Sequence, residues 1–313
     1  MDIVVLGSFI QACCWKVPRL PKPGETLTAS ELLIELGGKG LNVAIGTRRL
    51  GADVELLLGI GQDAAGDRLM ELLKHENIPT THVWRLAEKS GHGAGFIADD
   101  GQNMISIFPG PNLLLTETHV DQAETALQTA TLVYAQLETS LTAVIRAFKI
   151  ARRHGIRTVL NVSPWIDLPT QLLDYTDVLL INEIEASQLL GLSTPLPESL
   201  ADWCHELSAR LAPYWLQWPG SLIVVTLGRK GSIAVDRSGK SYQASAFIVD
   251  TIDSTGAGDA FASGFCIEMA KNSELETALL CGNACGALAA SKLGVLHALP
   301  DQATLQKFVR SQA

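Results

Sequence analysis

The sequence predicts a doubly wound α/β fold, in which helices cover both faces of a mostly parallel central sheet. Two observations support this prediction. Short apolar runs alternate with helical patterns along most of the 313 residues, and the runs are continuously apolar, as in strands that are buried on both faces. Such alternation is typical of layered α/β proteins. A third observation, that two segments break the alternation, predicts a small additional β lid.

The expected elements follow the chain in order. We expect buried strands at 3–6, 54–58, 131–134, 157–160, 177–181 and 221–226. Helical patterns occur at 39–50, 64–76, 117–129, 140–154, 183–191, 197–212, 257–271 and 274–292. Residues 245–250 are apolar and β-rich, so a further strand is expected just before the helix at 257.

Two segments do not fit a helix-covered sheet. Residues 10–36 contain three prolines followed by an extended stretch. Residues 91–108 hold two β-rich runs around Asp99-Asp-Gly-Gln102, whose Asp-Gly pair is a typical hairpin turn. We therefore expect 10–36 and 91–108 to form an antiparallel β lid. The α/β domain then comprises the other three ranges, 1–9, 37–90 and 109–313.

Composition and charge argue against several classes of partner. The net charge is −9, whereas nucleic acid and anionic membranes attract clustered Lys and Arg. No apolar run approaches the ~20 residues of a membrane-spanning helix, and the first residues lack the basic stretch of a signal peptide. The cysteines and histidines show no zinc-site spacing. We expect a cytoplasmic enzyme whose ligands are small molecules.

The most informative motif is Asp253-Ser-Thr-Gly-Ala-Gly-Asp-Ala-Phe261. Gly256 and Gly258 precede Asp259 where the chain enters a helix. Residues without Cβ let backbone N–H groups at a helix N-terminus approach an anion closely. A carboxylate within that turn repels phosphate unless it acts on a proton, so a general base beside an anion site is indicated. The alternative is a glycine-rich turn in which Asp259 only caps the helix.

Two further motifs begin helices. Gly37-Gly-Lys-Gly-Leu-Asn-Val-Ala44 differs from a Walker phosphate loop, because Gly40 follows Lys39. Close backbone approach together with the Asn42 amide suits recognition of hydroxyl groups; the alternative is an ordinary helix start. Asn182-Glu-Ile-Glu185 places an amide and a carboxylate on one helix face. That pair suits a phosphate and a water-coordinated Mg²⁺, or it caps the helix.

Polar groups also follow two other strands. Glu138 ends the strand at 131–134, and Thr226-Leu-Gly-Arg-Lys-Gly231 follows the strand at 221–226. Ligands of open α/β sheets gather at the carboxyl ends of the strands. The glycines of the second segment leave room for a flat base or a phosphate, or they serve only as turn residues.

Taken in order, these motifs resemble those of the ribokinase-like (PfkB) family of ATP-dependent sugar kinases. That family carries G-G-K-G-x-N, N-x-x-E and D-T-x-G-A-G-D, which correspond here to 37–42, 182–185 and 253–259. Shorter matches occur at Pro23–Thr26, Gly61–Gly66, Gly110–Asn112 and Gln136–Glu138. The resemblance runs from about residue 3 to residue 300. It implies transfer of the ATP γ-phosphate to a hydroxyl group, expected to be primary, of a sugar or a sugar-like molecule.

The resemblance also implies a role for each matched residue. Asp259 is the expected general base, and the amides of Gly256, Ala257 and Gly258 form the expected anion hole. Such transfer depends mainly on positioning and electrostatics. The expected sugar contacts are Gly38, Lys39, Asn42, Glu138 and Asp259.

The nucleotide side is assigned in the same way. Asn182 is expected at the phosphates and Glu185 at Mg²⁺, through water. Asp250, Ile252 and the carbonyls near Gly294 correspond to a K⁺ site of many members. The remaining expected nucleotide contacts are Thr226, Gly228, Gly231 and Asn283. Family members often dimerise through the lid, so a homodimer is expected here.

One departure leaves the acceptor open. Sugar kinases of this family usually have a pattern like G-S-x-N-x-D after the first strand, and its polar side chains bind sugar hydroxyls. This chain has Ile10 and Ala12 in place of that Asn and Asp. A site that lacks hydroxyl-binding groups selects a different ligand, so D-ribose as the acceptor is in doubt. Gln11 faces the pocket only if the strand register shifts.

Two alternatives remain. One is a phosphosugar or nucleoside kinase of the same fold, for which Lys16, Arg19 and Lys22 supply extra cations if they are not simply solvated. The other is a sugar- or nucleotide-binding regulatory protein that has lost turnover. The intact Asp259 motif argues against the second alternative.

Overall fold

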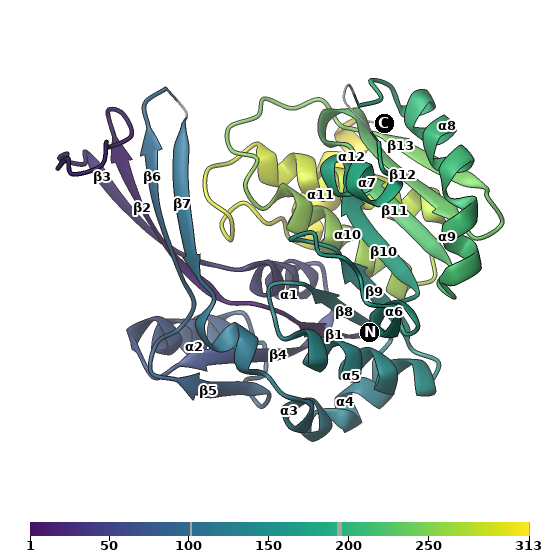
Figure 1. Cartoon of the computed structure of the whole chain (residues 1–313), viewed down its shortest axis with the longest axis horizontal. Helices are drawn as coiled ribbons and strands as arrows, with labels where there is room; N and C mark the ends of the chain where they lie inside the picture. Colours follow the sequence, from purple (N-terminus) through teal and green to yellow (C-terminus); the bar gives the residue numbers. More distant parts are fainter. Residues whose placement is uncertain (101, 193–195, 313) are drawn as a thin grey trace.

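A computed structural model describes residues 1–100, 102–192 and 196–312. Its large sheet has nine strands, and the strands at its centre are parallel (Figure 1). From one edge to the other, the strands are β13 (Ser241–Ser245), β12 (Gly231–Asp236), β11 (Leu222–Thr226), β10 (Val178–Asn182), β9 (Arg157–Asn161), β8 (Leu132–Gln136), β1 (Asp2–Leu6), β4 (Asp53–Gly61) and β5 (Val83–Ala87). Only β12 and β13 pair antiparallel with their neighbours. The doubly wound, mostly parallel sheet predicted from sequence is confirmed.

Helices cover both faces of this sheet. One face packs on α1 (Lys39–Arg49), α2 (Ala64–His75), α10 (Ala257–Ala270), α11 (Leu275–Ala290) and α12 (Gln302–Gln312). The other face packs on α3 (Glu117–Gln122), α4 (Glu124–Thr129), α5 (Leu141–Arg153), α6 (Thr170–Leu173), α7 (Glu183–Leu190), α8 (Leu200–Arg210) and α9 (Ala212–Gln217). No helix within the described ranges is long and apolar enough to cross a membrane.

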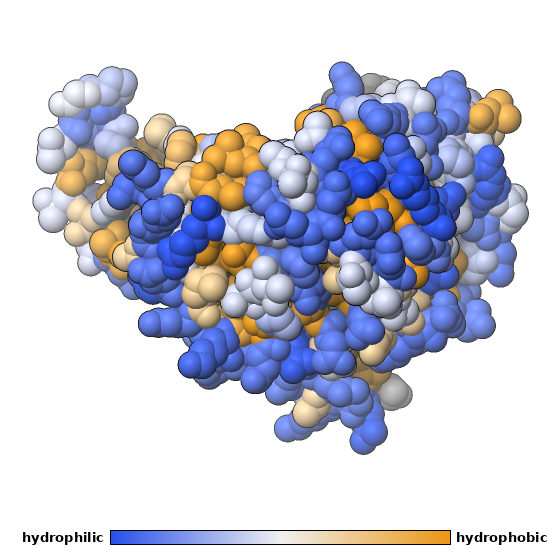
Figure 2. Space-filling view, turned by 90° about the horizontal axis from the view of Figure 1, so that it is seen from below, coloured by the Kyte–Doolittle hydropathy of each residue, from blue (hydrophilic) through white to orange (hydrophobic). Residues whose placement is uncertain are grey.

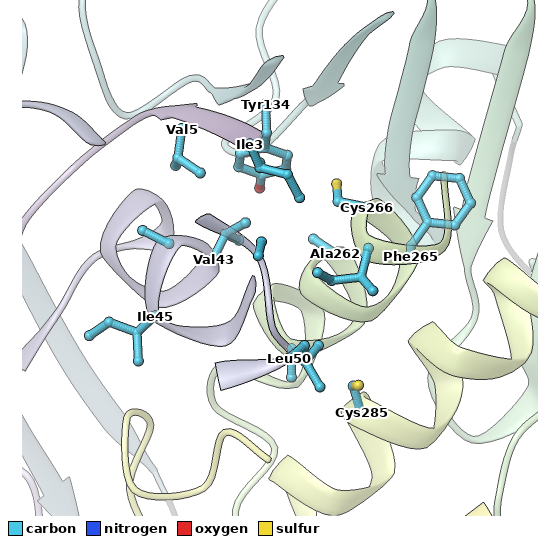
Figure 3. Close-up of a cluster of buried hydrophobic side chains, with 14 of the residues drawn as sticks. Ile3, Val5, Val43, Ile45, Leu50, Tyr134, Ala262, Phe265, Cys266 and Cys285 are labelled. Carbon is cyan, nitrogen blue, oxygen red and sulfur yellow. The ribbon is translucent and has the colours of Figure 1, made fainter. Parts of the chain in front are cut away.

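Each central strand contributes side chains to two hydrophobic cores, because successive side chains point to opposite faces of the sheet. In β1, Ile3 belongs to one core and Val4 to the other. Figure 3 shows side chains of α1 (Val43) and α10 (Cys266) beneath Ile3 and Tyr134 of the sheet. This double burial explains why the strands are continuously apolar.

A small sheet projects from the body (Figure 1). Its strand order is β3 (Glu31–Gly37), β2 (Ile10–Val17), β6 (His92–Ala98) and β7 (Asn103–Phe108). The expectation of a purely antiparallel lid is wrong in one pair, since β2 and β6 run parallel. Both strands leave the body at the same place, where Gln11 N–H donates to Gly91 O at 2.9 Å. Their hairpin partners β3 and β7 return antiparallel.

Several boundaries differ from the expectations. The strand expected at 245–250 is wrong: β13 ends at Ser245, and the following segment is irregular, with Ile248 95% exposed. The helix expected at 117–129 is interrupted at Ala123, which separates α3 from α4. The strands β5, β12 and β13 were not expected. The turn expected at Asp99–Gln102 includes Gly101, which lies outside the described residues. Two short 3₁₀ helices occupy 110–114 and 228–230.

Candidate active site

The sequence motifs meet at the carboxyl end of the large sheet. Gly7 follows β1, Glu138 follows β8, and Asn182 and Thr226 end β10 and β11. The N-termini of α1, α7 and α10 approach the same edge. A small cavity of ≈ 100 Å³ there has in its wall residues from the three motifs, Lys39, Asn182, Glu185, Gly258 and Asp259, together with Thr226.

Asp259 lies in the first turn of α10 and is only 7% exposed. Asn42 Nδ2 of α1 donates a hydrogen bond of 2.7 Å to its Oδ2. Burial raises the pKa of the Asp259 carboxyl to about 6, and the Glu138 charge also raises it, while Lys39 and the Asn42 bond lower it. A buried carboxyl with a pKa near 6 is suited to accept a proton at neutral pH.

The turn before Asp259 leaves the N-terminus of α10 without a side-chain cap. Gly256 is the N-cap residue with φ 77°, a left-handed conformation that glycine adopts without strain. A Cβ atom at Gly256 would lie 2.6 Å from Val295 Cγ1, whereas one at Gly258 would meet no atom within 4 Å. The open space at Gly258 therefore borders uncapped helix amides, as an anion site requires.

The loop into α1 passes very close to the end of β1. Gly38 has φ 112°, and a Cβ there would lie 2.5 Å from Ser8 O. A Cβ at Gly40 would lie 2.4 Å from Gly7 Cα. Only glycine permits this approach, which sets Asn42 beside Asp259. Asn42 Oδ1 is buried and has no hydrogen-bond partner among the described residues, so a ligand hydroxyl can donate to it.

Glu138 is held between β1 and α1. It accepts a 2.6 Å hydrogen bond from Ser8 Oγ, which in turn accepts one of 2.9 Å from Gln136 Nε2. Lys39 Nζ lies 4.0 Å from Glu138 Oε1. The carboxylate is thereby fixed near Lys39 and Asp259. These groups supply a donor and acceptors for hydroxyls at one place.

Asn182 and Glu185 form a capping box at the start of α7. Asn182 Oδ1 accepts from the N–H groups of Ile184 and Glu185, and Glu185 Oε2 accepts from Asn182 N–H at 2.8 Å. Burial raises the pKa of Glu185, although the Asn182 and Ser163 hydrogen bonds and the Lys39 charge oppose this. The two residues cap a helix and also line the small cavity. Helix capping and a site for phosphate and Mg²⁺ are therefore compatible interpretations of this motif.

A larger cavity of ≈ 320 Å³ lies on the other side of the Gly256–Gly258 turn. Its lining is mainly apolar, which suits a flat base. The predicted residues among its walls are Thr226, Gly228, Gly231, Ala257, Gly258 and Asn283. Asn283 Nδ2 donates to Ala244 O and Ser245 O at 2.9 and 3.1 Å, so this side chain also ties α11 to β13. Gly258 lines both cavities.

The residues expected at K⁺ do not enter either cavity. Asp250 is exposed, Ile252 is 64% exposed, and Gly294 lies against Glu35 of β3. No group of three or more His, Cys, Asp or Glu side chains suited to a metal occurs in the described ranges. The K⁺ site stays a prediction.

Sequence reasoning missed several polar groups of the site. Ser8 and Gln136 support Glu138, and Asn161 and Ser163 line the small cavity. Asn161 ends β9, so the rule that ligands gather at strand ends would have found it. Gln136 belongs to the Gln136–Glu138 match, but a buried glutamine inside an apolar strand does not indicate which group it contacts.

Comparison with known proteins agrees with this geometry. The family model for pfkB family carbohydrate kinases matches residues 1–302. A ribokinase of Staphylococcus aureus is 35% identical over 301 residues, covering 95% of this chain and 96% of the relative. A deoxyribokinase of Salmonella typhi is 31% identical over 281 residues, covering 89% of each chain.

A solved structure of Arabidopsis thaliana ribokinase, complexed with ribose and ATP, has a TM-score of 0.90 at 28% identity. The match covers 99% of this chain and 98% of that one. The order of motifs, the cavities at the strand ends and the full-length matches agree. The chain therefore belongs to the pfkB family of carbohydrate kinases.

Proposed function

We propose that this carbohydrate kinase transfers the γ-phosphate of ATP to a hydroxyl of a sugar, with Asp259 as the general base. The observation that carries this proposal is the buried Asp259 carboxyl, whose pKa is about 6 and which lies beside an uncapped helix N-terminus. Asp259 removes the proton of the acceptor hydroxyl as that oxygen attacks phosphorus. The N–H groups of Gly256, Ala257 and Gly258 offset the negative charge on the transferred group.

The acceptor is positioned by the groups around Asp259. Asn42 Oδ1 has no partner within the described part of the chain and Lys39 Nζ carries a positive charge, while the Glu138 carboxylate is fixed by Ser8. Gly38 contributes the backbone turn that brings these groups together. Such an array binds several hydroxyls of one small molecule, and holding the reacting hydroxyl in place lowers the entropic barrier.

ATP fits the larger cavity, with its base among the apolar side chains and its phosphates toward Gly258, which borders both cavities. Glu185 and Asn182 would hold Mg²⁺, Glu185 through water, since Mg²⁺ keeps several of its waters. The metal would screen phosphate charge. The Glu185 carboxyl lines the small cavity, and carboxylate oxygens are the ligands that Mg²⁺ prefers. Lys39, in the same cavity, supplies a positive charge for the phosphates.

Two of the three lid cations, Lys16 and Arg19, do not favour a phosphosugar as acceptor. Arg19 forms an ion pair with Glu25, and Lys16 Nζ lies 4.0 Å from Glu31 Oε2. These pairs lie toward the free ends of the lid strands, and their charges are already compensated. Unphosphorylated sugars are therefore the first class of acceptor to test.

The test is a coupled ATP-consumption assay with pentoses, hexoses, phosphosugars and nucleosides. At least one sugar should be phosphorylated in the presence of Mg²⁺, and Asp259→Asn should reduce kcat by about 10²–10⁴-fold. Asp121→Asn on α3 is the matched control, because that carboxylate pairs with Arg146 on the outer surface. Absence of any ATP- and Mg²⁺-dependent phosphorylation would favour a non-catalytic binding protein.

Three properties extend this proposal. The small sheet (β3, β2, β6 and β7) acts as a lid over the acceptor and as the surface of a homodimer. The enzyme acts in the cytoplasm, where ATP is available. Asp250, Ile252 and the carbonyls near Gly294 bind a stimulating K⁺, which predicts a higher rate in KCl than in NaCl at equal ionic strength.

A further inference from the structure

One row of side chains crosses the face of the lid that carries Ala12. In the register of the small sheet, Glu35 of β3 lies opposite Ala12 of β2, Ala12 opposite Gly93 of β6, and Gly93 opposite Ile107 of β7. Directly paired residues share one face of a sheet. Glu35 is therefore the only polar side chain in this row, which we call the inner row.

The neighbouring position of β2 is apolar as well. Ile10 pairs with Gly37, and its Cδ1 lies 2.8 Å from where a Cβ of Gly91 would stand. Gln11 points to the opposite face, where its side chain contacts His92 and accepts a hydrogen bond from Arg68. β2 thus offers no polar side chain on the Ala12 face at either of these positions.

Two residues of β3 connect this face of the lid to the active site. Glu35 Oε1 lies 2.9 Å from the Cβ position of Gly294, and the next residue, Val295, packs on the Gly256 turn. On the other side, Gly37 lies opposite Ile10, and its Cβ position is 3.8 Å from Asn42 Oδ1. The Glu35 carboxylate therefore lies beside the Gly294–Val295 segment that contacts the Gly256 turn, and Gly37, two residues further along β3, lies beside Asn42. Glu35 also lines a cavity of ≈ 250 Å³ together with Arg49 and His297.

The charge of Glu35 is not neutralised by the lid. Among the described ion pairs of this sheet, Lys16 is joined to Glu31 and Arg19 to Glu25. Burial raises the pKa of the Cys14 thiol, and the negative charge of Glu35 raises it further. An ionised carboxylate only accepts hydrogen bonds. Arg49 of α1 lines the same cavity as Glu35 but is paired with Glu76, and no hydrogen bond or ion pair of the Glu35 carboxylate occurs among the described residues. When an acceptor and the closing lid exclude water, Glu35 therefore needs a donor from the ligand.

We propose that Glu35 is the residue of the lid that selects the acceptor, an inference that rests on the proposed sugar-kinase function. The carboxylate that the family usually has at position 12 is replaced by one on the adjacent strand, about 4.8 Å away. The preferred acceptor is a sugar that presents an apolar edge, a deoxy or methyl carbon, to Ile10 and Ala12. The same sugar directs a hydroxyl or ammonium donor toward Glu35.

The first experiment measures binding, so that it does not depend on turnover. Calorimetry in Mg²⁺ and a non-hydrolysable ATP analogue compares D-ribose, 2-deoxy-D-ribose, L-rhamnose, L-fucose and D-glucosamine. A deoxy sugar or the amino sugar should bind more tightly than D-ribose. Glu35→Gln should weaken the binding of the tightest-binding sugar by about tenfold or more. Glu31→Gln is the matched control, since Glu31 lies on the same strand and face, and binding should change less than about twofold.

The second experiment returns the carboxylate to β2. The double variant Ala12→Asp/Glu35→Ala should shift the ratio of D-ribose to 2-deoxy-D-ribose affinity toward D-ribose by about tenfold or more, relative to wild type. Melting temperatures and affinity for the ATP analogue show that each variant is folded. Unchanged sugar selectivity in Glu35→Gln and in the double variant, or the tightest binding to D-ribose in wild type, would overturn the proposal.

The outcomes separate this inference from the proposed function. If the wild-type protein binds a sugar selectively through Glu35 but transfers no phosphate, the kinase function fails and the role of Glu35 stands. If the wild-type protein phosphorylates sugars and Glu35→Gln leaves both selectivity and KM unchanged, only the role of Glu35 fails. Binding of none of the five sugars by the wild-type protein would refute the role of Glu35.

Discussion

At the scale of single residues, the environment of Asp259 links activity to pH. The carboxyl is buried and accepts a hydrogen bond from Asn42, and burial is the main reason that its pKa is raised to about 6. A general base must be ionised to accept a proton. Because the pKa is raised, the base becomes protonated, and activity is lost, at a pH at which most proteins are still folded.

The first prediction concerns this pH dependence. The value of kcat/KM should fall about tenfold per pH unit below pH about 6, because the protonated Asp259 cannot act as a base. Asn42→Ala removes the hydrogen bond that lowers this pKa, so the acid limb should move to higher pH. Steady-state rates from pH 5 to 8 measure both effects. An acid limb that moves to lower pH in Asn42→Ala would contradict the assignment.

The second prediction concerns stability. Between the ordinary pKa of Asp, 3.8, and about 6, the folded protein binds a proton at Asp259 that the unfolded chain has lost. Stability therefore falls as pH rises through this window, and ionised Asp259 costs up to about 3 kcal/mol above it. Asp259→Asn, despite its loss of activity, should be more stable than wild type at pH 8, with the difference shrinking toward pH 4. Urea unfolding at both pH values tests this.

At the scale of elements, the two glycines of the turn into α10 have different roles. Gly256 is required by packing, whereas Gly258 borders the space expected for the ligand. Gly256→Ala places a Cβ against Val295 in a left-handed conformation, and this should cost about 2–4 kcal/mol of stability. Gly258→Ala meets no atom within 4 Å, so its melting temperature should stay near that of wild type.

The third prediction follows from this pair of glycines. Because the Gly258 methyl group would enter the space between the two cavities, Gly258→Ala should lower kcat/KM for ATP by about 10–100-fold. Thermal unfolding and steady-state kinetics of both variants give the comparison. Wild-type kinetics in Gly258→Ala would show that no phosphate approaches this amide.

Some elements of the fold could be predicted from sequence patterns and others could not. The central strands could be predicted because burial on both faces makes them continuously apolar, and the three motifs could be placed because each begins a helix after a strand. The prediction of a strand at 245–250 was wrong for a related reason. Phe247 and Val249 are apolar because they line the larger cavity, and an apolar run carries no information about hydrogen-bonded neighbours. The parallel pairing of β2 with β6 was missed for the same reason.

At the scale of the whole molecule, one face of the lid carries exposed apolar side chains. Figure 2 shows the lid as an arm at the left, with the outline hollowed between this arm and the rest of the molecule. The face opposite the inner row carries Leu32, Trp15, Phe96 and Met104 in one row across the four strands. Ile34, on the same face, is 48% exposed. Contiguous exposed apolar side chains of this kind usually mark an interface.

The last prediction tests this surface as the proposed interface of a homodimer. Ile34→Lys places a charge in the middle of the face, and burying it against a second copy would leave an unpaired charge in an apolar contact. Light scattering should therefore change from a dimer for wild type to a monomer for Ile34→Lys. Leu216→Lys is the matched control, because Leu216 on α9 is 88% exposed and far from the lid in the fold, and this variant should remain dimeric. A monomeric wild type at micromolar concentration would exclude the dimer. If Ile34→Lys is monomeric and its KM for sugar rises while its KM for ATP stays constant, the second copy also holds the lid in place over the acceptor.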